Sequence, residues 1–323
     1  MTAMIAIRAL VRRTDRAVLA AMACNALLLV AGALYDANFL SPAYLLQQLQ
    51  VASFLGVIAT GVLLVVLLGH IDLSIPWVVT LGGMMSTASA GHAGVAGSLA
   101  IPFAIACGVG IGLVNGIGVA YLRVPSMIFT LATNTIAQGL MVVHTSGFAP
   151  QDHATRAMHF LAVERSIFGI PNAVWVWAVI GAATVAMLRR TAFGRRIYAI
   201  GNGERAVYLS RGHVGRVVVG CFAISGACSA FAGVLLAGYS TKAYQAMGDP
   251  YLLPAIAAVV LGGANILGGR GSYLGTVAGV VLVTLLQSIL SIIQMPEAGR
   301  QVIYGTVIIL MLLAYGRRPK GVT

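Results

Sequence analysis

Long apolar runs separated by short polar gaps occupy almost the whole chain, and their lengths are close to the roughly 20 residues that cross a bilayer as a helix. Two of these runs, 76–95 and 251–268, are rich in glycine, so we expect them to be broken, tilted or re-entrant. The pattern predicts an all-α integral membrane protein, a polytopic bundle of about ten transmembrane helices, or eight or nine if a broken run does not cross. The expected spans are residues 17–35, 50–69, 76–95, 98–122, 127–145, 173–189, 217–239, 251–268, 273–295 and 301–316.

Composition agrees with a membrane protein and excludes other classes. Of the 323 residues, 59% are hydrophobic and 9% are charged, whereas about 25% of residues are charged in soluble domains. The net charge of +12 does not indicate a nucleic-acid partner, because the arginines lie in the gaps between apolar runs and form no basic face interleaved with aromatic residues. They follow the positive-inside pattern of membrane proteins instead.

The distribution of basic residues also predicts the orientation of the chain. With ten spans and a cytoplasmic N-terminus, sixteen of the 20 Lys and Arg residues fall on the cytoplasmic side. This arrangement gives a basic cytoplasmic N-terminus at 1–16, a transmembrane domain at 17–316 and a cytoplasmic C-terminus at 317–323. The N-terminus resembles a signal peptide but has no clear small-residue cleavage site, so we expect an uncleaved first span.

Catalytic and metal-binding patterns are missing from the sequence. The four cysteines lie in apolar runs without a CxxC pair, and the six histidines are scattered without a carboxylate cluster. The two lysines, Lys242 and Lys320, fit no phosphate-cradling Gly-x-x-x-x-Gly-Lys-Ser/Thr loop. We therefore expect no enzymatic activity, no metal, no cofactor and no ATP bound by such a loop.

Asp72 is isolated in the sequence, because no other Asp, Glu, Lys or Arg occurs between Asp36 and Arg123. Ser74 followed by Pro76 is typical of a helix start, and Asp72 would lie near the positive end of that helix dipole. One interpretation is helix initiation at the cytoplasmic end, which this pattern favours. The other is a broken helix that brings Asp72 and Ser74 to a translocation path.

Four uncharged polar residues lie well inside apolar runs. Each can hydrogen-bond a neighbouring helix, or line a path for a neutral hydroxylated solute, which needs no fixed charge. They are Asn115, Asn134, Gln138 and Asn265.

Glycines recur every four residues at Gly108, Gly112 and Gly116, and again at Gly275 and Gly279. Such stripes let helix backbones approach closely in lipid. We expect these glycines to pack helices together and not to bind a ligand.

The segment 189–216 carries seven arginines and is too long for a simple turn. The sequence Gly201-Asn202-Gly203 is typical of a turn, and the residues from Glu204 to Ser210 can form a short amphipathic helix. Two interpretations stay open: docking of a cytoplasmic partner, or a basic loop that only anchors the topology.

This segment resembles the coupling segment of ATP-binding-cassette (ABC) importer permeases of the ribose, xylose and arabinose family, T-x-x-G-R-x-I-Y-A-I-G-G-N-x-x-A-A-x-x-S-G-I. Three further stretches are similar to family motifs: G-H-I-D-L-S, P-S-M-I-F-T-L at 125–131, and A-I-A-A-V-V-L-G-G-A-N-I-L-G-G-R-G-S-Y-L-G-T at 255–276. The likeness covers roughly residues 43–316. The chain departs from the motifs at His70, which replaces a glycine, at Asn202, which is shifted ahead of Gly203, and at Arg211.

The resemblance implies a permease of the bacterial inner membrane that works as a homodimer by alternating access. Its implied partners are a cytoplasmic ABC ATPase that hydrolyses ATP, a periplasmic or extracellular sugar-binding protein, membrane lipid and a second copy of the permease. The implied solute is a monosaccharide or related polyol, with a ribose-like sugar favoured. The residues implied in ATPase coupling are Arg195, Gly201, Asn202, Glu204, Ala206, Leu209 and Ser210.

The main alternative is an ion-coupled secondary transporter of a small polar solute. Such carriers usually use ionisable groups at membrane depth. Of the eight acidic residues, only Asp72 is a candidate for that role.

Overall fold

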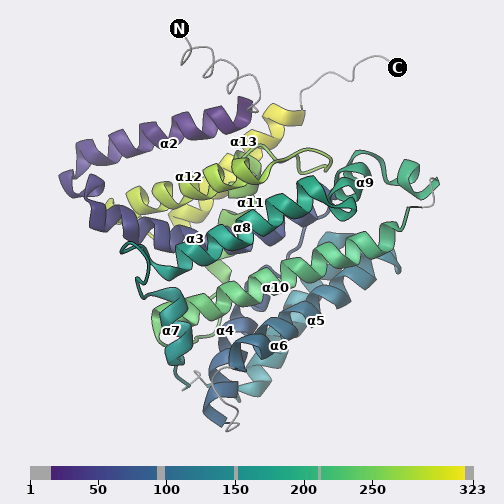
Figure 1. Cartoon of the computed structure of the whole chain (residues 1–323), viewed down its shortest axis with the longest axis horizontal. Helices are drawn as coiled ribbons and strands as arrows, with labels where there is room; N and C mark the ends of the chain where they lie inside the picture. Colours follow the sequence, from purple (N-terminus) through teal and green to yellow (C-terminus); the bar gives the residue numbers. More distant parts are fainter. Residues whose placement is uncertain (1–15, 93–98, 149–151, 210–211, 317–323) are drawn as a thin grey trace.

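The computed structural model describes residues 16–92, 99–148, 152–209 and 212–316 (Figure 1). Ser210, the C-terminus 317–323 and all but the last residue of the expected N-terminal segment 1–16 lie outside the described residues. The described chain is built from α-helices, which are connected by short loops and two 3₁₀ turns. The α-helices are α2 (Arg16–Tyr35), α3 (Pro42–Leu67), α4 (Ile75–His92), α5 (Ala100–Ala120), α6 (Ser126–His144), α7 (Arg156–Ala162), α8 (Asn172–Arg190), α9 (Ala192–Leu209), α10 (Val214–Ser240), α11 (Leu252–Leu261), α12 (Tyr273–Ile292) and α13 (Glu297–Gly316).

The polytopic helical fold is confirmed. Within the described residues, seven helices are long and apolar enough to cross a membrane, namely α2, α3, α5, α6, α8, α10 and α12. The expected broken span at 251–268 is also observed, because α11 ends at Leu261 and a glycine-rich loop follows it. The described part of the run at 76–95 forms helix α4 without a break as far as His92, and the first half of α4 is buried in the bundle.

Helix α3 begins earlier than the apolar run at 50–69 predicts. Ser41 caps its first turn by accepting the N–H of Tyr44 at 3.3 Å, and Pro42 occupies the first turn, where its missing N–H costs nothing. The glutamines at the start of α3 interrupt the apolar pattern, but Gln50 is buried and donates to the carbonyl of Ala162 at 2.7 Å.

Helices α3 and α10 join two groups of helices (Figure 1). In the first group, α4, α5 and α7 pack on α10, and α6 packs against α4 and α5. In the second group, α11 and α12 pack on α3, while α2 packs against α12 and α13 packs against α11. The glycine stripes make these contacts close, as predicted. A Cβ built on Gly108 or Gly112 would meet a backbone carbonyl oxygen of α10 at 2.4 or 2.3 Å, so these positions exclude a side chain. Gly275 and Gly279 meet the end of α11 in the same way.

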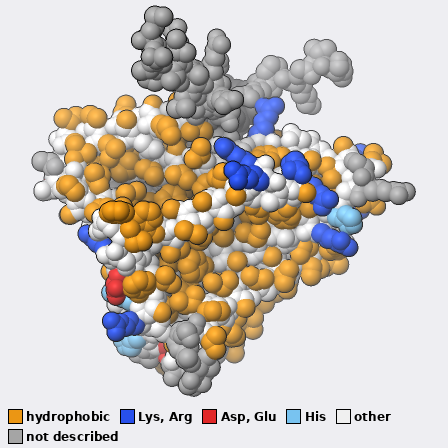
Figure 2. All heavy atoms as spheres, in the orientation of Figure 1, with side chains coloured by type: hydrophobic (Ala, Val, Ile, Leu, Met, Phe, Trp, Pro, Cys, Tyr) orange, Lys and Arg blue, Asp and Glu red, His pale blue; other side chains and the backbone are white. Residues whose placement is uncertain are grey.

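The C-terminal ends of α3 and α8, the start of α10 and the whole of α9 lie at one end of the bundle (Figure 1). Most of the Lys and Arg side chains visible in Figure 2 lie toward this end, and hydrophobic side chains dominate the surface between the two ends. This end is called the α9 end below.

Candidate functional site

Residues 68–74, called the Asp72 segment below, form a non-helical segment between α3 and α4 that is exposed at Gly69 and becomes buried at Asp72 and Ser74. Asp72 is 4% exposed. It accepts hydrogen bonds from the backbone N–H of Ser74 at 3.0 Å, from the Ser74 hydroxyl at 2.6 Å and from the Ser225 hydroxyl at 2.9 Å. Since Ser225 lies about three turns, roughly 16 Å, into α10, the carboxylate lies at depth and not at the end of the bundle.

The hydrogen-bond network of Asp72 continues across two more helices. Asn115 of α5, which is fully buried, donates from its amide to the Ser74 hydroxyl at 2.8 Å. The Thr133 hydroxyl of α6 donates to the amide oxygen of Asn115 at 2.6 Å. The structure therefore joins three of the predicted polar residues, Asp72, Ser74 and Asn115, into one buried cluster.

Helix α6 also holds the backbone of the 68–74 segment. The N–H groups of Ile71 and Leu73 donate to the hydroxyls of Ser126 and Thr130, at 3.3 and 2.9 Å. These side chains satisfy backbone donors that an irregular segment would otherwise leave unpaired inside a membrane protein.

The start of α4 differs in one respect from the sequence prediction. Asp72 does lie just before the first turn, but the Ser74 hydroxyl does not cap it, because that hydroxyl is engaged by Asp72 and Asn115. The Asn134 side chain of α6 accepts the N–H of Trp77 at 3.3 Å instead. The cap of α4 is thus supplied by another helix, which ties α4 to α6.

Among the described residues, no Lys or Arg forms an ion pair with Asp72. The carboxylate is stabilised by three hydrogen-bond donors and by its place near the N-terminus of α4. A buried charge without such partners would be strongly destabilising.

The two remaining predicted polar residues lie away from this cluster. Gln138 is exposed on α6 and forms no hydrogen bond with any described residue. Asn265 lies in the loop after α11, where its side chain accepts the N–H of Leu267 and donates to the carbonyl of Gly268, both at 3.2 Å. Asn265 therefore shapes a turn at the α9 end.

Helix α9 consists of two helical pieces that meet at Gly203, whose backbone (φ 178°, ψ 88°) is extended. The first piece is anchored to the bundle by the buried side chains of Ile197 and Ile200. Gly201 touches the end of α3 so closely that a Cβ there would lie 2.0 Å from the carbonyl oxygen of Leu67. The sequence predicts a turn at Gly201-Asn202-Gly203, whereas α9 continues through Gly201 and Asn202 and is interrupted at Gly203. The contact with α3 is not predicted.

The loop between α11 and α12 completes the anchor of α9. The N–H of Gly269 donates to the carbonyl of Leu67 at 2.9 Å, and the Asn202 amide donates to the carbonyl of Gly269 at 3.2 Å. The Tyr198 hydroxyl donates to the carbonyl of Gly271 at 3.0 Å. The first piece of α9 is therefore connected to the end of α3, five residues before Asp72.

The second piece of α9 projects away from the bundle (Figure 1). Glu204, Arg205 and Ala206 are exposed, and Tyr208 and Leu209 are 67% and 82% exposed. Arg195, on the first piece, is exposed as well, while Ser210 lies outside the described residues. The combination of exposed charges with an exposed aromatic ring and leucine is typical of a protein-binding surface.

A cavity of about 870 Å³ lies between the Asp72 segment and the second piece of α9. His70 and Ser126 line it on one side, and Glu204, Arg205 and Leu209 line it on the other. Burial lowers the pKa of His70 below its ordinary value, and the Glu204 carboxylate acts in the opposite direction.

A second polar cavity, of about 470 Å³, lies near the other end of the bundle between α3, α12 and the start of α13. The Thr284 hydroxyl is buried there without a hydrogen-bond partner in the described chain. Sequence reasoning missed this cavity, although polar residues at helical spacing on α12 were a signal for it. Its polar lining is formed by Tyr44, Gln48, Tyr251, Thr284, Gln287, Ser288, Ser291, Glu297 and Arg300.

Comparisons with known proteins agree with this architecture. The family model described as "Branched-chain amino acid transport system / permease component" matches residues 44–312. The ribose import permease protein RbsC of Haemophilus influenzae is 32% identical over 86% of each chain, and that of Bacillus subtilis is 33% identical over 89% of each chain. The L-arabinose ABC transporter permease protein AraH of Azospirillum brasilense is 30% identical, over 85% of this chain and 80% of its own. No solved structure matches the chain.

The match covers both cavities, the Asp72 cluster and α9, and it confirms the resemblance found in the four sequence motifs. The ion-coupled alternative is not favoured, because two of the named relatives are import permeases and the third is named as an ABC transporter permease. The chain therefore belongs to this family of transport-system permease components, as the multi-pass inner-membrane subunit of an ABC importer.

Proposed function

We propose that the second piece of α9 is the docking site of a cytoplasmic ABC ATPase, and that hydrolysis on this partner drives import through the chain. The observation that carries the proposal is the exposure of Tyr208 and Leu209 on a charged helix whose first piece is anchored to the bundle by buried side chains. A projection that merely fixed the topology would need charges but no exposed apolar side chains. The α9 end is then cytoplasmic, as are both termini.

The anchor of α9 supplies a route from the ATPase to the interior of the permease. A displacement of the second piece toward the bundle would be transmitted to Gly201 in the first piece. Because the backbones of Gly201 and Leu67 are already in close contact, the end of α3 would have to move as well. The end of α3 would then carry the Asp72 segment with it. We infer that closure of the ATPase changes the packing of α3, α4 and α6 and so switches the side on which the path is open.

The proposed solute is a monosaccharide or related polyol, with a ribose-like sugar favoured. The names of the relatives, two ribose permeases and one arabinose permease, support it. The cavity of about 470 Å³, at the end of the bundle opposite the α9 end, is lined by hydroxyl and amide groups that can bind sugar hydroxyls, and the buried Thr284 hydroxyl has no hydrogen-bond partner in the described chain. We propose this cavity as the outer part of the path, with the Asp72 cluster fixing the helices beside it.

A second copy of the chain is proposed to cover the face of α6 that bears Gln138. An amide exposed to lipid without a partner is unfavourable, and Gln138 has no hydrogen-bond partner in the described chain. In a homodimer this residue would face the other copy or a path between the two copies. Asn134, one turn earlier, would hold α4 in place beside that path.

The test of the docking proposal is co-purification of the ATPase with permease variants. We expect Glu204→Lys and Ala206→Trp to lose most of the bound ATPase while the spans stay folded. Glu164→Lys, an exposed carboxylate reversed at the opposite end of the bundle, is the matched control and should retain the ATPase. Unchanged ATPase binding and unchanged solute-stimulated hydrolysis in both α9 variants would refute the docking site.

The solute is tested separately, on the cognate binding protein. Calorimetric titration with ribose, arabinose and leucine should detect binding of a sugar and not of the amino acid. Binding of leucine alone would indicate that the transported solute is a branched-chain amino acid, the class named in the family description.

A further inference from the structure

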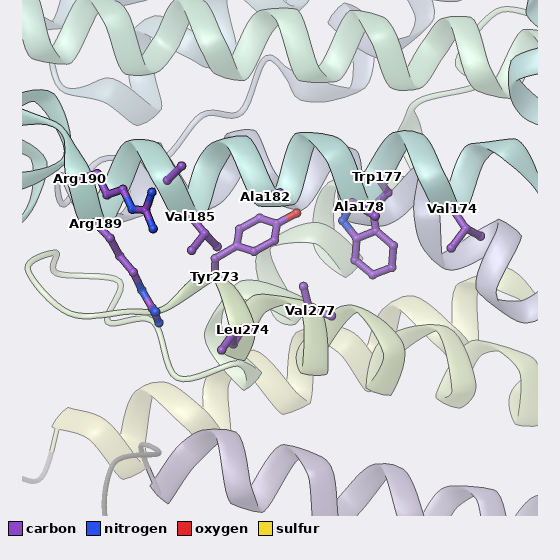
Figure 3. A pocket seen from close by; sticks show the side chains of 12 residues that line it. Val174, Trp177, Ala178, Ala182, Val185, Arg189, Arg190, Tyr273, Leu274 and Val277 are labelled. Atoms are coloured by element: carbon purple, nitrogen blue, oxygen red, sulfur yellow. The ribbon is translucent and has the colours of Figure 1, made fainter. Parts of the chain in front are cut away.

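A groove of about 660 Å³ runs along the surface between α8 and α12, and it shares no lining residue with the two cavities described above (Figure 3). Trp177 and Tyr273 point into it, and each is only 7% exposed. Gly181 lets the Tyr273 ring pack directly against α8 in this groove, since a Cβ on Gly181 would lie 2.7 Å from the ring. Its apolar walls are formed by Val174, Ala178, Ala182, Val185 and Ala186 of α8 and by Leu274 and Val277 of α12.

The interior of the groove is lined almost entirely by apolar side chains, so it provides few hydrogen-bonding groups for a polar solute. The hydroxyl of Tyr273 is already paired with the Thr60 hydroxyl at 3.1 Å, so it is engaged on the core side. An occupant of this part must therefore be apolar. The stretch from Val174 to Val185 is about 17 Å long, close to the roughly 15 Å of hydrocarbon in one leaflet of a bilayer.

Arg189 and Arg190 line one end of the same groove (Figure 3). Both are exposed, and neither forms an ion pair with a described acidic residue. They occupy the last turn of α8, where a cation is also favoured by the helix dipole. The dipole alone explains a basic residue at this place, but it does not explain a fitted apolar groove that leads to it.

We propose that the groove binds an anionic phospholipid of the cytoplasmic leaflet, with an acyl chain between α8 and α12 and the phosphate on Arg189 and Arg190. Charge complementarity selects this occupant, because basic pockets between transmembrane helices on the cytoplasmic side suit acidic lipid headgroups. The headgroup would lie at the junction of α8 and α9, two residues before Ala192. Bound lipid would thus hold the base of the segment proposed to receive the ATPase.

The test is native mass spectrometry of the full transporter with added phosphatidylglycerol or phosphatidylcholine of identical acyl chains. We expect the wild type to prefer phosphatidylglycerol by about thirtyfold, from two basic residues at an anionic surface. Arg189→Gln/Arg190→Gln should abolish this preference. Ala182→Trp, which places a ring in the groove from an exposed position, should reduce the binding of both lipids.

The matched control is Arg165→Gln, which removes an exposed arginine at the other end of the bundle. It should leave the lipid preference unchanged. Equal binding of the two lipids by the wild type overturns the proposal, as does retention of phosphatidylglycerol in both groove variants. Disulfide formation between two Ala182→Cys chains in place of lipid binding would assign the groove to a second copy instead.

Discussion

Asp72 is a charged residue with 4% of its surface exposed, whereas Leu209 is an apolar residue with 82% exposed. The buried carboxylate has three donors around it, so its burial is compensated within the chain. The exposed leucine has no such compensation, because the described chain offers nothing to cover it. The first region is therefore complete within one chain, whereas under the proposed docking the ATPase covers the second.

The largest effect is expected from Asp72→Ala. This change leaves the N–H and hydroxyl of Ser74 and the hydroxyl of Ser225 without an acceptor inside the bundle, which costs about 3–5 kcal/mol of stability. Thermal or detergent-induced unfolding of the purified permease would measure the loss. Asp72→Asn keeps one acceptor oxygen, so its loss should be clearly smaller. If Asp72→Ala is as stable as the wild type, the cluster does not stabilise the fold.

A change at Gly201 should separate the two regions functionally. In Gly201→Ala the new methyl group would overlap the carbonyl of Leu67 at 2.0 Å, so the first piece of α9 must move away from α3. We expect the ATPase to bind within about twofold of the wild-type affinity, while transport falls by about tenfold or more. Uptake and ATPase binding, measured on the same reconstituted complex, would show the split.

The control for this change is Gly203→Ala on the same helix. A Cβ at Gly203 meets only the Cβ of Ala206, at 3.9 Å, and its extended backbone suits any residue. Transport by this variant should stay close to the wild type. If both glycine variants transport equally well, the contact between α9 and α3 does not transmit the motion.

A smaller effect is expected from Leu209→Ala at the tip of α9. If the ATPase covers this side chain, its removal weakens binding by about tenfold, because burial of a leucine is worth about 1.5–3 kcal/mol. The stability of the permease alone should not change, since the side chain is exposed there. Phe168→Ala, at a 90% exposed residue on the opposite end, is the matched control and should bind the ATPase normally.

The sequence alone predicts most of the fold, because each apolar run of about 20 residues has one structural solution in a membrane. It misplaces the start of α3, where Gln47, Gln48 and Gln50 look like an end to the span although Gln50 is buried and hydrogen-bonded. The reason is that a partner 112 residues away satisfies the amide. No local pattern contains that information.

The candidate site was predictable only in part, because some of its hydrogen-bond partners are also distant in sequence. Asp72, Ser74 and Asn115 stand out as polar residues in or beside apolar runs, and the structure brings them together. Thr133 and Ser225 do not stand out, because hydroxyl residues in helices often bond only to their own backbone. The pairing of Ser225 with Asp72 spans 153 residues and depends on how α10 packs against α4.

The smallest effect is a pH dependence that arises between the two regions, at His70. Burial keeps the folded-state pKa of His70 below its ordinary value of 6.5, so the unfolded chain takes up a proton at a higher pH than the folded chain does. The contribution of His70 to stability is therefore constant above pH 6.5 and is lost as the pH falls below it. We expect the unfolding temperature to fall by about 1–2 °C more between pH 7 and pH 5 in the wild type than in His70→Gln.

Because the Glu204 carboxylate raises the pKa of His70, Glu204→Gln should enlarge the pH effect. An identical pH profile for Glu204→Gln and the wild type would mean that Glu204 and His70 do not interact electrostatically across the cavity. Helix α9 would then act on the Asp72 segment only through its backbone contact with α3.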